Sequence, residues 1–409
     1  MVQPPGRPPP TSVVIVSRHR PQALARCLDA LTRQSHPDFE IVLVADPDAV
    51  GARPDLPLKR LAFDRANISE ARNAGIALAA GEVVAFIDDD ALAVPGWAEA
   101  LTVPFADPRV LAATGFTRGP DGLSWQARAE RMTRSGQALA LDLDLDRPAL
   151  LAPEAGLPIS TIGTNCAFRR DALAAIGGFD PAFAYHLDES DVNMRMAARF
   201  PQALTAVVPR AQVIHGIAPG AARAAGNVPR DLTAIGRSAA IFAARHGGTL
   251  DWTRHSQRRR LLRHMVAGRL DPFAVAPLLA SLERGIAEGT AQGGAVPPPP
   301  DPPDWAAPPR FHRFETRVPP HLVLSGWYWQ RRRLRAEAAR AVAGGALVTV
   351  LLLTPGVQPH RMLLTRGGWW EQRGGLWGAS QPGDSSMVLM GWAARIRREG
   401  PKLLDLGSK

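Results

Sequence analysis

The sequence of 409 residues is poor in several features that define common classes of protein. Its two cysteines, Cys27 and Cys166, are too few for a disulfide framework or a cysteine zinc site. The longest apolar run, residues 341–353, contains two glycines and is shorter than the roughly 20 residues of a membrane-spanning helix. The first ten residues lack the apolar segment of a secretory signal. We therefore expect a cytoplasmic protein with no transmembrane anchor of its own.

Lysine is almost absent as well, because only three of the 48 basic residues are lysine. The net charge of +10 is therefore carried by arginine, and it is unevenly distributed along the chain. Residues 1–217 contain 21 basic and 25 acidic residues, whereas residues 218–409 contain 27 and 13. With 46% hydrophobic and 21% charged residues, the composition is that of a globular protein and excludes global disorder. The charge distribution predicts two unlike halves.

The first 90 residues alternate between short apolar runs and segments with helical spacing. The runs at 12–16, 40–44 and 83–87 are typical of buried parallel strands, and 21–31 and 69–80 have the spacing of helices. This order predicts a doubly wound α/β fold. Such folds bind ligands beyond the carboxyl ends of their strands, and polar residues follow each predicted strand there.

The remaining chain divides by composition. Residues 97–157 are expected to be mainly helical with an exposed acidic stretch at 141–146, a second organised block follows at 159–215, and helical spacing returns at 220–290. A basic helix at 329–342 and a strand at 347–353 follow a proline-rich segment. The predicted units are a proline-rich flap (1–11), a catalytic domain (12–217), a helical extension (218–295), a linker (296–310) and a small basic, aromatic-rich α+β module (311–409).

Two acidic clusters could carry chemistry. Asp88, Asp89 and Asp90 follow a buried strand, where three repelling carboxylates make sense if a cation such as Mg²⁺ or Mn²⁺ joins them on a diphosphate. The alternative is an acidic loop that caps the next helix. Asp188 and Asp191 lie on one face of a predicted helix, with Arg195 one turn further. They could supply a general base, or merely a solvated helix start with an ion pair between Asp191 and Arg195.

The order of these segments resembles the family 2 glycosyltransferases. The resemblance rests on SVVIVSRHRPQALARCLDALTRQSHPDFEIVLVAD, NISEARNAGIALAAGEVVAFIDDD and GTNCAFRRDALAAIGGFDPAFAYHLDESDVNMRM, which fall within residues 12–217. It implies a GT-A fold, a Rossmann-like mixed sheet flanked by helices, with a bound divalent metal and a nucleotide-diphospho-sugar donor. The helical region and the small α+β module would follow this domain.

The resemblance also implies roles for individual residues. The residues expected around the nucleotide sugar are Ser17, Arg18, Asp46, Arg72, Asn73, Asp88 and Asp89. Ala45 departs from the acidic residue that the family usually has there, so Asp46 is its expected substitute. Asp88 and Asp90 match the D-x-D metal motif, and His215 matches a histidine that completes the metal site in some relatives.

The expected catalytic base is a carboxylate near residue 189. The family has a Glu-Asp pair where this sequence has Asp188-Glu189, and alignment on Arg195 makes Glu189 the base, with Asp188 and Asp191 as alternatives. Thr164, Asn165 and Trp97 are expected on the acceptor side, although Trp97 could equally be a packing residue.

These features predict an inverting, metal-dependent glycosyltransferase that uses a UDP-linked sugar and a saccharide or lipid-linked acceptor in bacterial polysaccharide or glycoconjugate assembly. The alternative is a catalytically silent scaffold that acts through its basic half. A nucleotidyltransferase is disfavoured because no glycine-rich, lysine-containing loop follows the first strand. The arginine clusters at 258–260 and 331–335 indicate either contact with the inner face of an anionic membrane or a solvated helix surface. Nucleic acid is not expected as a partner.

Overall fold

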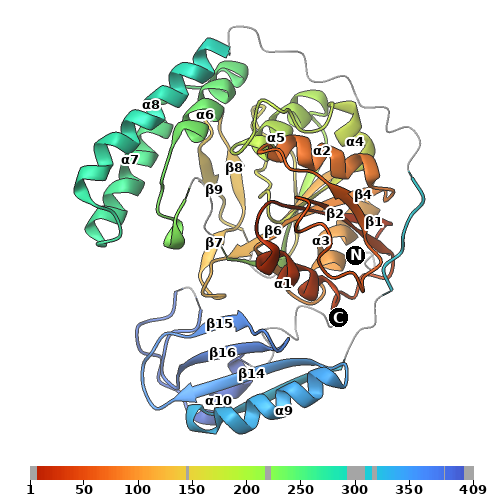
Figure 1. Ribbon diagram of the computed structural model, residues 1–409, viewed down its shortest axis with the longest axis vertical. Helices are drawn as coiled ribbons and strands as arrows, with labels where there is room; N and C mark the ends of the chain where they lie inside the picture. The colour runs from red at the N-terminus through yellow and green to blue at the C-terminus, as the bar shows by residue number, and fades with distance from the viewer. Residues whose placement is uncertain are drawn as a thin grey trace.

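The computed structural model describes residues 7–143, 147–216, 223–292, 309–315, 320–381 and 383–399. It contains a large mixed sheet with helices on both faces, a group of long helices beside it, and a small sheet module at the carboxyl end (Figure 1). This architecture confirms the predicted fold class.

The large sheet combines parallel and antiparallel strands. Strands β1, β2, β3 and β4 pair in parallel, and β11 runs antiparallel between β4 and β6. The order is β10-β12-β6-β11-β4-β1-β2-β3, with β5 paired to β12 and β7 to β6. Its strands are β1 (Thr11–Ser17), β2 (Phe39–Ala45), β3 (Lys59–Ala62), β4 (Val83–Asp88), β5 (Ala91–Ala93), β6 (Val110–Arg118), β7 (Trp125–Ala127), β10 (Ala149–Leu151), β11 (Cys166–Arg169) and β12 (Leu204–His215).

Side chains of successive strand residues enter two separate apolar cores, because they point to opposite faces of the sheet. Val13 and Ile15 join the core beneath α1 and α3, whereas Val14 joins the core beneath α2, α4 and α5. The helices are α1 (Pro21–Leu31), α2 (Ile68–Leu78), α3 (Trp97–Thr102), α4 (Arg170–Ala175) and α5 (Asp188–Arg199). Both faces of the sheet are therefore covered, as the continuous apolar strands require (Figure 1).

The prediction of helices between residues 97 and 157 was wrong. Only α3 and a short 3-10 turn at Val103–Ala106 are helical there, and the rest of the described segment consists of short strands joined by turns and loops. Two of these strands, β8 (Glu130–Met132) and β9 (Ala138–Ala140), form a separate two-stranded ribbon. Most of them are only three residues long, so they pair with distant partners without a periodic pattern of their own. Part of the acidic stretch at 141–146 lies outside the described residues.

The helical extension consists of α6 (Thr233–His246), α7 (Asp251–Val266) and α8 (Val275–Gln292). Helices α6 and α8 approach closely because glycines face the neighbouring backbone. A Cβ on Gly236 would lie 2.2 Å from the carbonyl oxygen of Leu282, and one on Gly285 would lie 1.9 Å from that of Thr233. No helix in the described ranges is both long and apolar enough to span a bilayer.

The carboxyl-terminal module is a four-stranded sheet with the order β13-β14-β16-β15. Its elements are β13 (His321–Trp327), α9 (Arg331–Ala343), β14 (Leu347–Thr354), β15 (Arg361–Leu364), β16 (Trp370–Gly375) and α10 (Trp392–Glu399). The predicted basic helix and strand correspond closely to α9 and β14. The boundaries predicted for the linker fall mostly outside the described residues.

Candidate active site

The carboxyl ends of β1, β2 and β4 meet at one edge of the sheet, and polar side chains gather there. Val16 lies opposite Asp88 in the parallel pairing of β1 with β4, and Ser17 lies opposite Ala45 in the pairing with β2. Strand β5 follows β4 directly and pairs antiparallel with β12, with Ala91 opposite His215. This pairing brings the end of a strand more than 100 residues away to the same edge.

Asp88, Asp90 and His215 form a group that could hold a metal ion. Each offers one ligand atom, and the three atoms all lie within 4.8 Å of one another. Nε2 of His215 is 3.2 Å from Oδ1 of Asp90 and 3.9 Å from Oδ2 of Asp88. Two carboxylates and an imidazole are donors suited to Mn²⁺ or Mg²⁺. The donor set therefore fits the implied divalent metal.

The second nitrogen of His215 is held by Gln126 of β7. Nδ1 lies 3.2 Å from Oε1 of Gln126, an oxygen that only accepts hydrogen bonds. When Nε2 binds a metal ion, the neutral imidazole would carry its proton on Nδ1 and donate it to this oxygen. Burial alone would lower the pKa of His215, but Asp90 and Asp88 outweigh burial and raise it. Gln126 thus orients the histidine as ligand-bound histidines are commonly oriented.

Two arginines that the sequence analysis did not single out flank these carboxylates. NH1 of Arg20 lies 3.1 Å from Oδ2 of Asp90, and NH2 of Arg223 lies 3.6 Å from the same oxygen. Arg20 was detectable in principle, because it stands three residues after the first strand. Arg223 and Gln126 belong to segments with no local signal. The arginines balance the carboxylate charge and could also contact a diphosphate.

Asp89, the middle residue of the motif, is not part of this group and is fully buried. Its Oδ2 accepts a 2.7 Å hydrogen bond from Oγ of Ser17, and its Oδ1 lies 3.3 Å from NH1 of Arg20. Burial raises the pKa of Asp89 to about 7, although Arg20 opposes this shift. Both Ser17 and Asp89 therefore fix the loop after β1 in this structure.

Arg18 begins the loop after β1 and Asp46 the loop after β2, and the two side chains differ in exposure. Arg18 is exposed and donates through Nε to Oδ1 of Asp64 at 2.7 Å. Asp46 is buried, and its carboxylate accepts from the backbone N–H groups of His19 at 2.7 Å and Asp48 at 3.2 Å. Asp46 thus shapes the loop after β1, whereas Arg18 presents its side chain to solvent.

Arg72 of α2 connects the metal-binding group to the first turn of α5. Its guanidinium pairs with Asp188, lies 3.5 Å from Oδ1 of Asp88, and donates to the carbonyl oxygen of Gly163 at 3.0 Å. Burial would lower the pKa of Arg72, but the charges of Asp188 and Asp88 outweigh burial and raise the pKa above its ordinary value. The guanidinium therefore stays charged. Neighbouring Asn73 instead exchanges hydrogen bonds of 2.7 and 2.9 Å with the backbone of Phe179 and fixes the segment before α5.

The carboxylates of α5 occupy different surroundings. Asp188 is buried against Arg72. Glu189 keeps part of its surface exposed, and a Cβ on Gly163 would lie 3.4 Å from its Cδ. Enclosure by the protein and the adjacent Asp188 raise the pKa of Glu189 well above its ordinary value, although Arg72 opposes them.

Asp191 is fully buried and surrounded by positive partners. Its Oδ2 accepts from Nε of Arg195 at 2.7 Å, and its Oδ1 lies 2.9 Å from NH1 of Arg245 and 3.0 Å from Nε2 of His246. Burial would raise the pKa of Asp191, but the bond to His246 and the charges of Arg195 and Arg245 lower it to about 2. Asp191 therefore joins α5 to the end of α6, and the ion pair expected between Asp191 and Arg195 is present.

The three residues expected on the acceptor side lie inside the domain. Trp97 is fully buried and donates from Nε1 to Oδ1 of Asn165 at 2.8 Å, so its indole has no face open to a sugar. Nδ2 of Asn165 donates to the carbonyl oxygens of Phe116 and Ala211. Thr164 is also buried, and its hydroxyl makes no hydrogen bond to any residue that the structure describes. The packing alternative describes Trp97 in this structure, and Asn165 ties β11 to β6 and β12.

The structure thus combines a mixed α/β sheet with two carboxylates and a histidine that meet at one edge of it. Residues 12–177 match the model of the family described as glycosyl transferase family 2. The similarity to glycosyl transferase family 2 thus lies in the amino-terminal part of this chain and covers less than half of its residues.

Two curated proteins match over part of their length. A glucosyl-dolichyl phosphate glucuronosyltransferase of Haloferax volcanii is 29% identical over 180 residues, which cover 41% of this chain and 55% of that protein. An uncharacterized glycosyltransferase of Bacillus subtilis, YwdF, is 32% identical over 94 residues, covering 22% of this chain and 35% of that protein. This chain thus spans about half or less of the length of these relatives.

Among solved structures, the mannosyltransferase PcManGT from Pyrobaculum calidifontis, in complex with GDP-Man and Mn²⁺, is 21% identical. The match covers 72% of this chain and 78% of that one, with a TM-score of 0.40. We draw no functional conclusion from it.

Proposed function

We propose that this protein is an inverting, metal-dependent glycosyltransferase. It transfers a sugar from a nucleotide-diphospho-sugar to a hydroxyl group of a saccharide or lipid-linked acceptor. The observation that carries this proposal is the continuous set of contacts from Asp90 and His215, through Asp88 and Arg72, to Asp188 beside Glu189. A metal-binding group and a candidate base are thereby held on one rigid framework.

Asp88, Asp90 and His215 would hold the divalent metal, which supplies charge neutralisation for the leaving diphosphate. Arg20 and Arg223 lie against Asp90 and add positive charge at the same place. The proposal that the donor is linked to UDP rests on the family resemblance, in which the position of Asp46 lies near the nucleotide base. The Haloferax relative is named for a lipid-linked glucosyl acceptor, which supports the lipid-linked alternative here.

Glu189 is the base in this proposal. Its carboxylate accepts the proton of the acceptor hydroxyl while that oxygen forms a bond to the anomeric carbon. The bond from the anomeric carbon to the diphosphate oxygen breaks, and the diphosphate leaves with the electron pair. A raised pKa makes Glu189 a stronger proton acceptor once it is ionised, whereas both oxygens of Asp191 are engaged by cationic partners. Asp188 neutralises Arg72 and thereby positions the first turn of α5.

The test is turnover with a set of nucleotide sugars (UDP-, GDP- and dTDP-linked) in the presence of Mn²⁺, followed by release of the nucleoside diphosphate. NMR of the product then gives the configuration at the anomeric carbon, which we expect to be inverted. Retention would contradict the mechanism. Absence of both turnover and nucleotide binding would favour the alternative of a silent scaffold.

A peripheral contact with an anionic membrane belongs to the same proposal. Phe273 is 90% exposed and Val266 is 83% exposed at the turn between α7 and α8. Exposed Arg258 and Arg259 lie on α7, about two turns before Val266. Apolar side chains next to arginines suit the headgroup region of an anionic leaflet.

Flotation with vesicles containing phosphatidylglycerol tests this contact. We expect the wild-type protein to float with anionic vesicles and Phe273→Ser to reduce the bound fraction. Val357→Ser, at an exposed position of the carboxyl-terminal module, is the matched control. Equal binding of Phe273→Ser and wild type would contradict contact through this turn.

A further inference from the structure

A cavity of about 590 Å³ lies between the amino-terminal domain and the carboxyl-terminal module. One wall is the segment from Asp121 to Glu130, which includes β7, and the other contains His360 and the residues 379–381. Its volume falls in the range of about 300–1,000 Å³ typical of small-molecule sites. In Figure 1, β7 extends from the large sheet toward this module.

The cavity reaches the candidate metal site through one residue. Gln126 lines the cavity, and its Oε1 contacts Nδ1 of His215. The carboxylate of Asp90 lies near Nε2, on the other side of the same imidazole ring. A molecule in the cavity that touches Gln126 therefore contacts a residue that lies directly against one of the candidate metal ligands.

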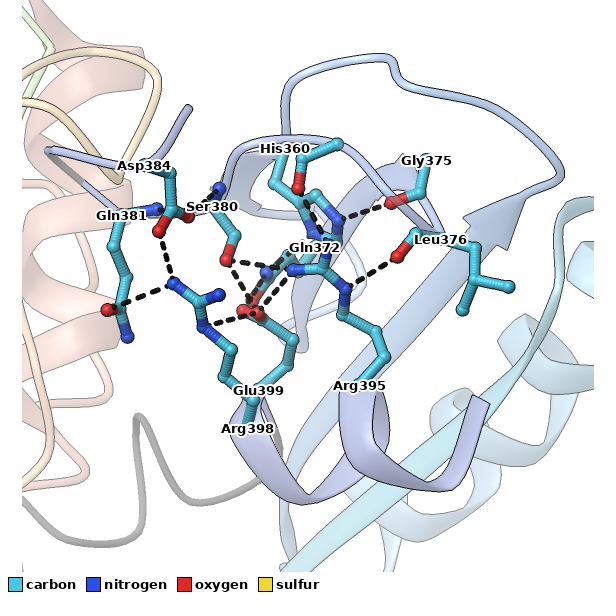
Figure 2. A network of polar contacts seen from close by, with 11 residues as sticks. His360, Gln372, Gly375, Leu376, Ser380, Gln381, Asp384, Arg395, Arg398 and Glu399 are labelled. Carbon is cyan, nitrogen blue, oxygen red and sulfur yellow. Dashed lines mark hydrogen bonds and ion pairs between the residues drawn. The ribbon is translucent and has the colours of Figure 1, made fainter. Parts of the chain in front are cut away.

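The cavity wall contributed by the module is fixed by a buried polar network (Figure 2). Arg395 of α10 is fully buried and donates to the carbonyl oxygens of Gly378 at 2.8 Å and Leu376 at 2.9 Å. Glu399 accepts from Oγ of Ser380 at 2.6 Å and also pairs with Arg395. Because both members of this buried ion pair also form hydrogen bonds, the network favours a single conformation of this cavity wall.

The module is also fixed to the opposite wall. The N–H of Met362 donates to the carbonyl oxygen of Asp121 at 2.7 Å, and Met362 shares an apolar core with Leu123 and Trp370. Gly122 has a φ of +74°, and a Cβ there would lie 2.7 Å from the carbonyl oxygen of Met362. Both walls are therefore set before any ligand enters, which reduces the entropy lost on binding.

The lining combines hydrogen-bond donors and acceptors with an aromatic ring. Gln126, Gln381 and Ser124 offer donors and acceptors, and Glu130 offers a carboxylate whose pKa is raised by burial. Trp125 adds a partly exposed indole, and the guanidinium carbon of Arg118 lies 4.3 Å from the centre of its ring. Hydroxyl groups match the polar side chains and the C–H face of a sugar ring suits an indole.

We infer that this cavity is the acceptor site and that the carboxyl-terminal module is its second wall. It binds a neutral saccharide of a few units, which reaches the metal site past Gln126. This inference rests on the proposed function, because it identifies where the acceptor of that reaction lies. It also gives the module a role in acceptor recognition that no motif in its sequence indicates.

The test fills the cavity without removing a hydrogen bond. Ala140 lines the cavity, and Ala138 lies two residues earlier on the same exposed strand β9 without lining it. Ala140→Trp should therefore block the site, and Ala138→Trp is the matched control. Binding of maltose, cellobiose and lactose is followed by saturation-transfer NMR, and the KM for transfer to the best of them is measured.

We expect wild type and Ala138→Trp to bind at least one disaccharide, and Ala140→Trp to lose the NMR signal and raise the acceptor KM about tenfold or more. Unchanged binding and KM in Ala140→Trp would overturn the inference, as would failure of the wild-type protein to bind all three saccharides. A parallel thermal-shift measurement with UDP, GDP or dTDP and Mn²⁺ separates the two proposals. A wild-type protein that responds to no nucleotide contradicts the proposed function itself.

Discussion

Arg72 and Asp188 form an ion pair in which both side chains are almost completely buried. The pair joins α2 to the first turn of α5, and the same guanidinium lies 3.5 Å from Asp88. Asp188 therefore neutralises an arginine that faces the metal-binding group. In the proposed mechanism Glu189, the next residue, is the carboxylate that acts as the base.

Breaking this pair should destabilise the protein. Asp188→Asn leaves a buried guanidinium without its main counter-charge, and loss of one partner of a buried pair costs about 3–5 kcal/mol. We expect a loss of that order in the free energy of unfolding, measured by urea denaturation. Arg18→Ala removes an exposed pair with Asp64 and should change stability by less than about 1 kcal/mol. Equal effects of the two variants would contradict the burial argument.

Asp191 should contribute to stability in a pH-dependent way. Its pKa is about 2 in the folded state, below the ordinary value of 3.8. The folded state therefore favours the ionised carboxylate, and the resulting stability is present above about pH 4 and lost as the pH falls through 2. This difference corresponds to about 2 kcal/mol.

Unfolding of wild type and Asp191→Asn between pH 7 and pH 2 measures this contribution. Since Asn cannot ionise, the stability of the variant should fall less steeply with acid than that of the wild type. Parallel curves for the two proteins would show that Asp191 is not the group responsible.

Gln126 should matter for metal affinity although it is not a candidate ligand. Its oxygen lies 3.2 Å from Nδ1 of His215 and would accept the Nδ1 proton when Nε2 binds a metal ion. Loss of such an orienting partner typically weakens metal binding about 10- to 100-fold. We expect Gln126→Ala to weaken Mn²⁺ binding in this range and His215→Ala to weaken it at least as much, as measured by calorimetry. His255→Ala, at an exposed position on α7, should leave it unchanged. Wild-type affinity in Gln126→Ala would contradict the orienting role.

Glu189→Gln should separate chemistry from binding. The amide cannot accept the proton of the acceptor hydroxyl, so transfer should fall by about 10²–10⁴-fold while Mn²⁺-dependent nucleotide binding is retained. Glu288→Gln changes an exposed carboxylate of α8 and should transfer at the wild-type rate. A fully active Glu189→Gln would move the base to another residue.

The sequence predicted the elements whose signal is local. The buried strands now called β1, β2 and β4 were recognisable because each is a continuous apolar run, and their order gave the fold class. The strands between residues 110 and 151 were missed because most are three residues long and depend on distant partners. Likewise, the proximity of Gln126 to His215 arises from the pairing of β6 with β7 and with β12, which no local pattern encodes.

The distinction among the three α5 carboxylates also required the structure. Their spacing alone left Asp188, Glu189 and Asp191 open as bases. The partners that separate them come from other elements, Arg72 from α2 and Arg245 and His246 from α6. Charge neutralisation across elements is not visible in the sequence of one helix.

Calorimetric titration of UDP, GDP and dTDP into wild type and Asp90→Ala, each with and without Mn²⁺, tests the central claim most directly. Asp90 contributes a carboxylate to the metal-binding group and lies 3.2 Å from Nε2 of His215. We predict that the wild-type protein binds at least one of these nucleotides only with Mn²⁺, and that Asp90→Ala loses this binding. Nucleotide binding that is independent of both Mn²⁺ and Asp90 would contradict a metal-dependent glycosyltransferase site.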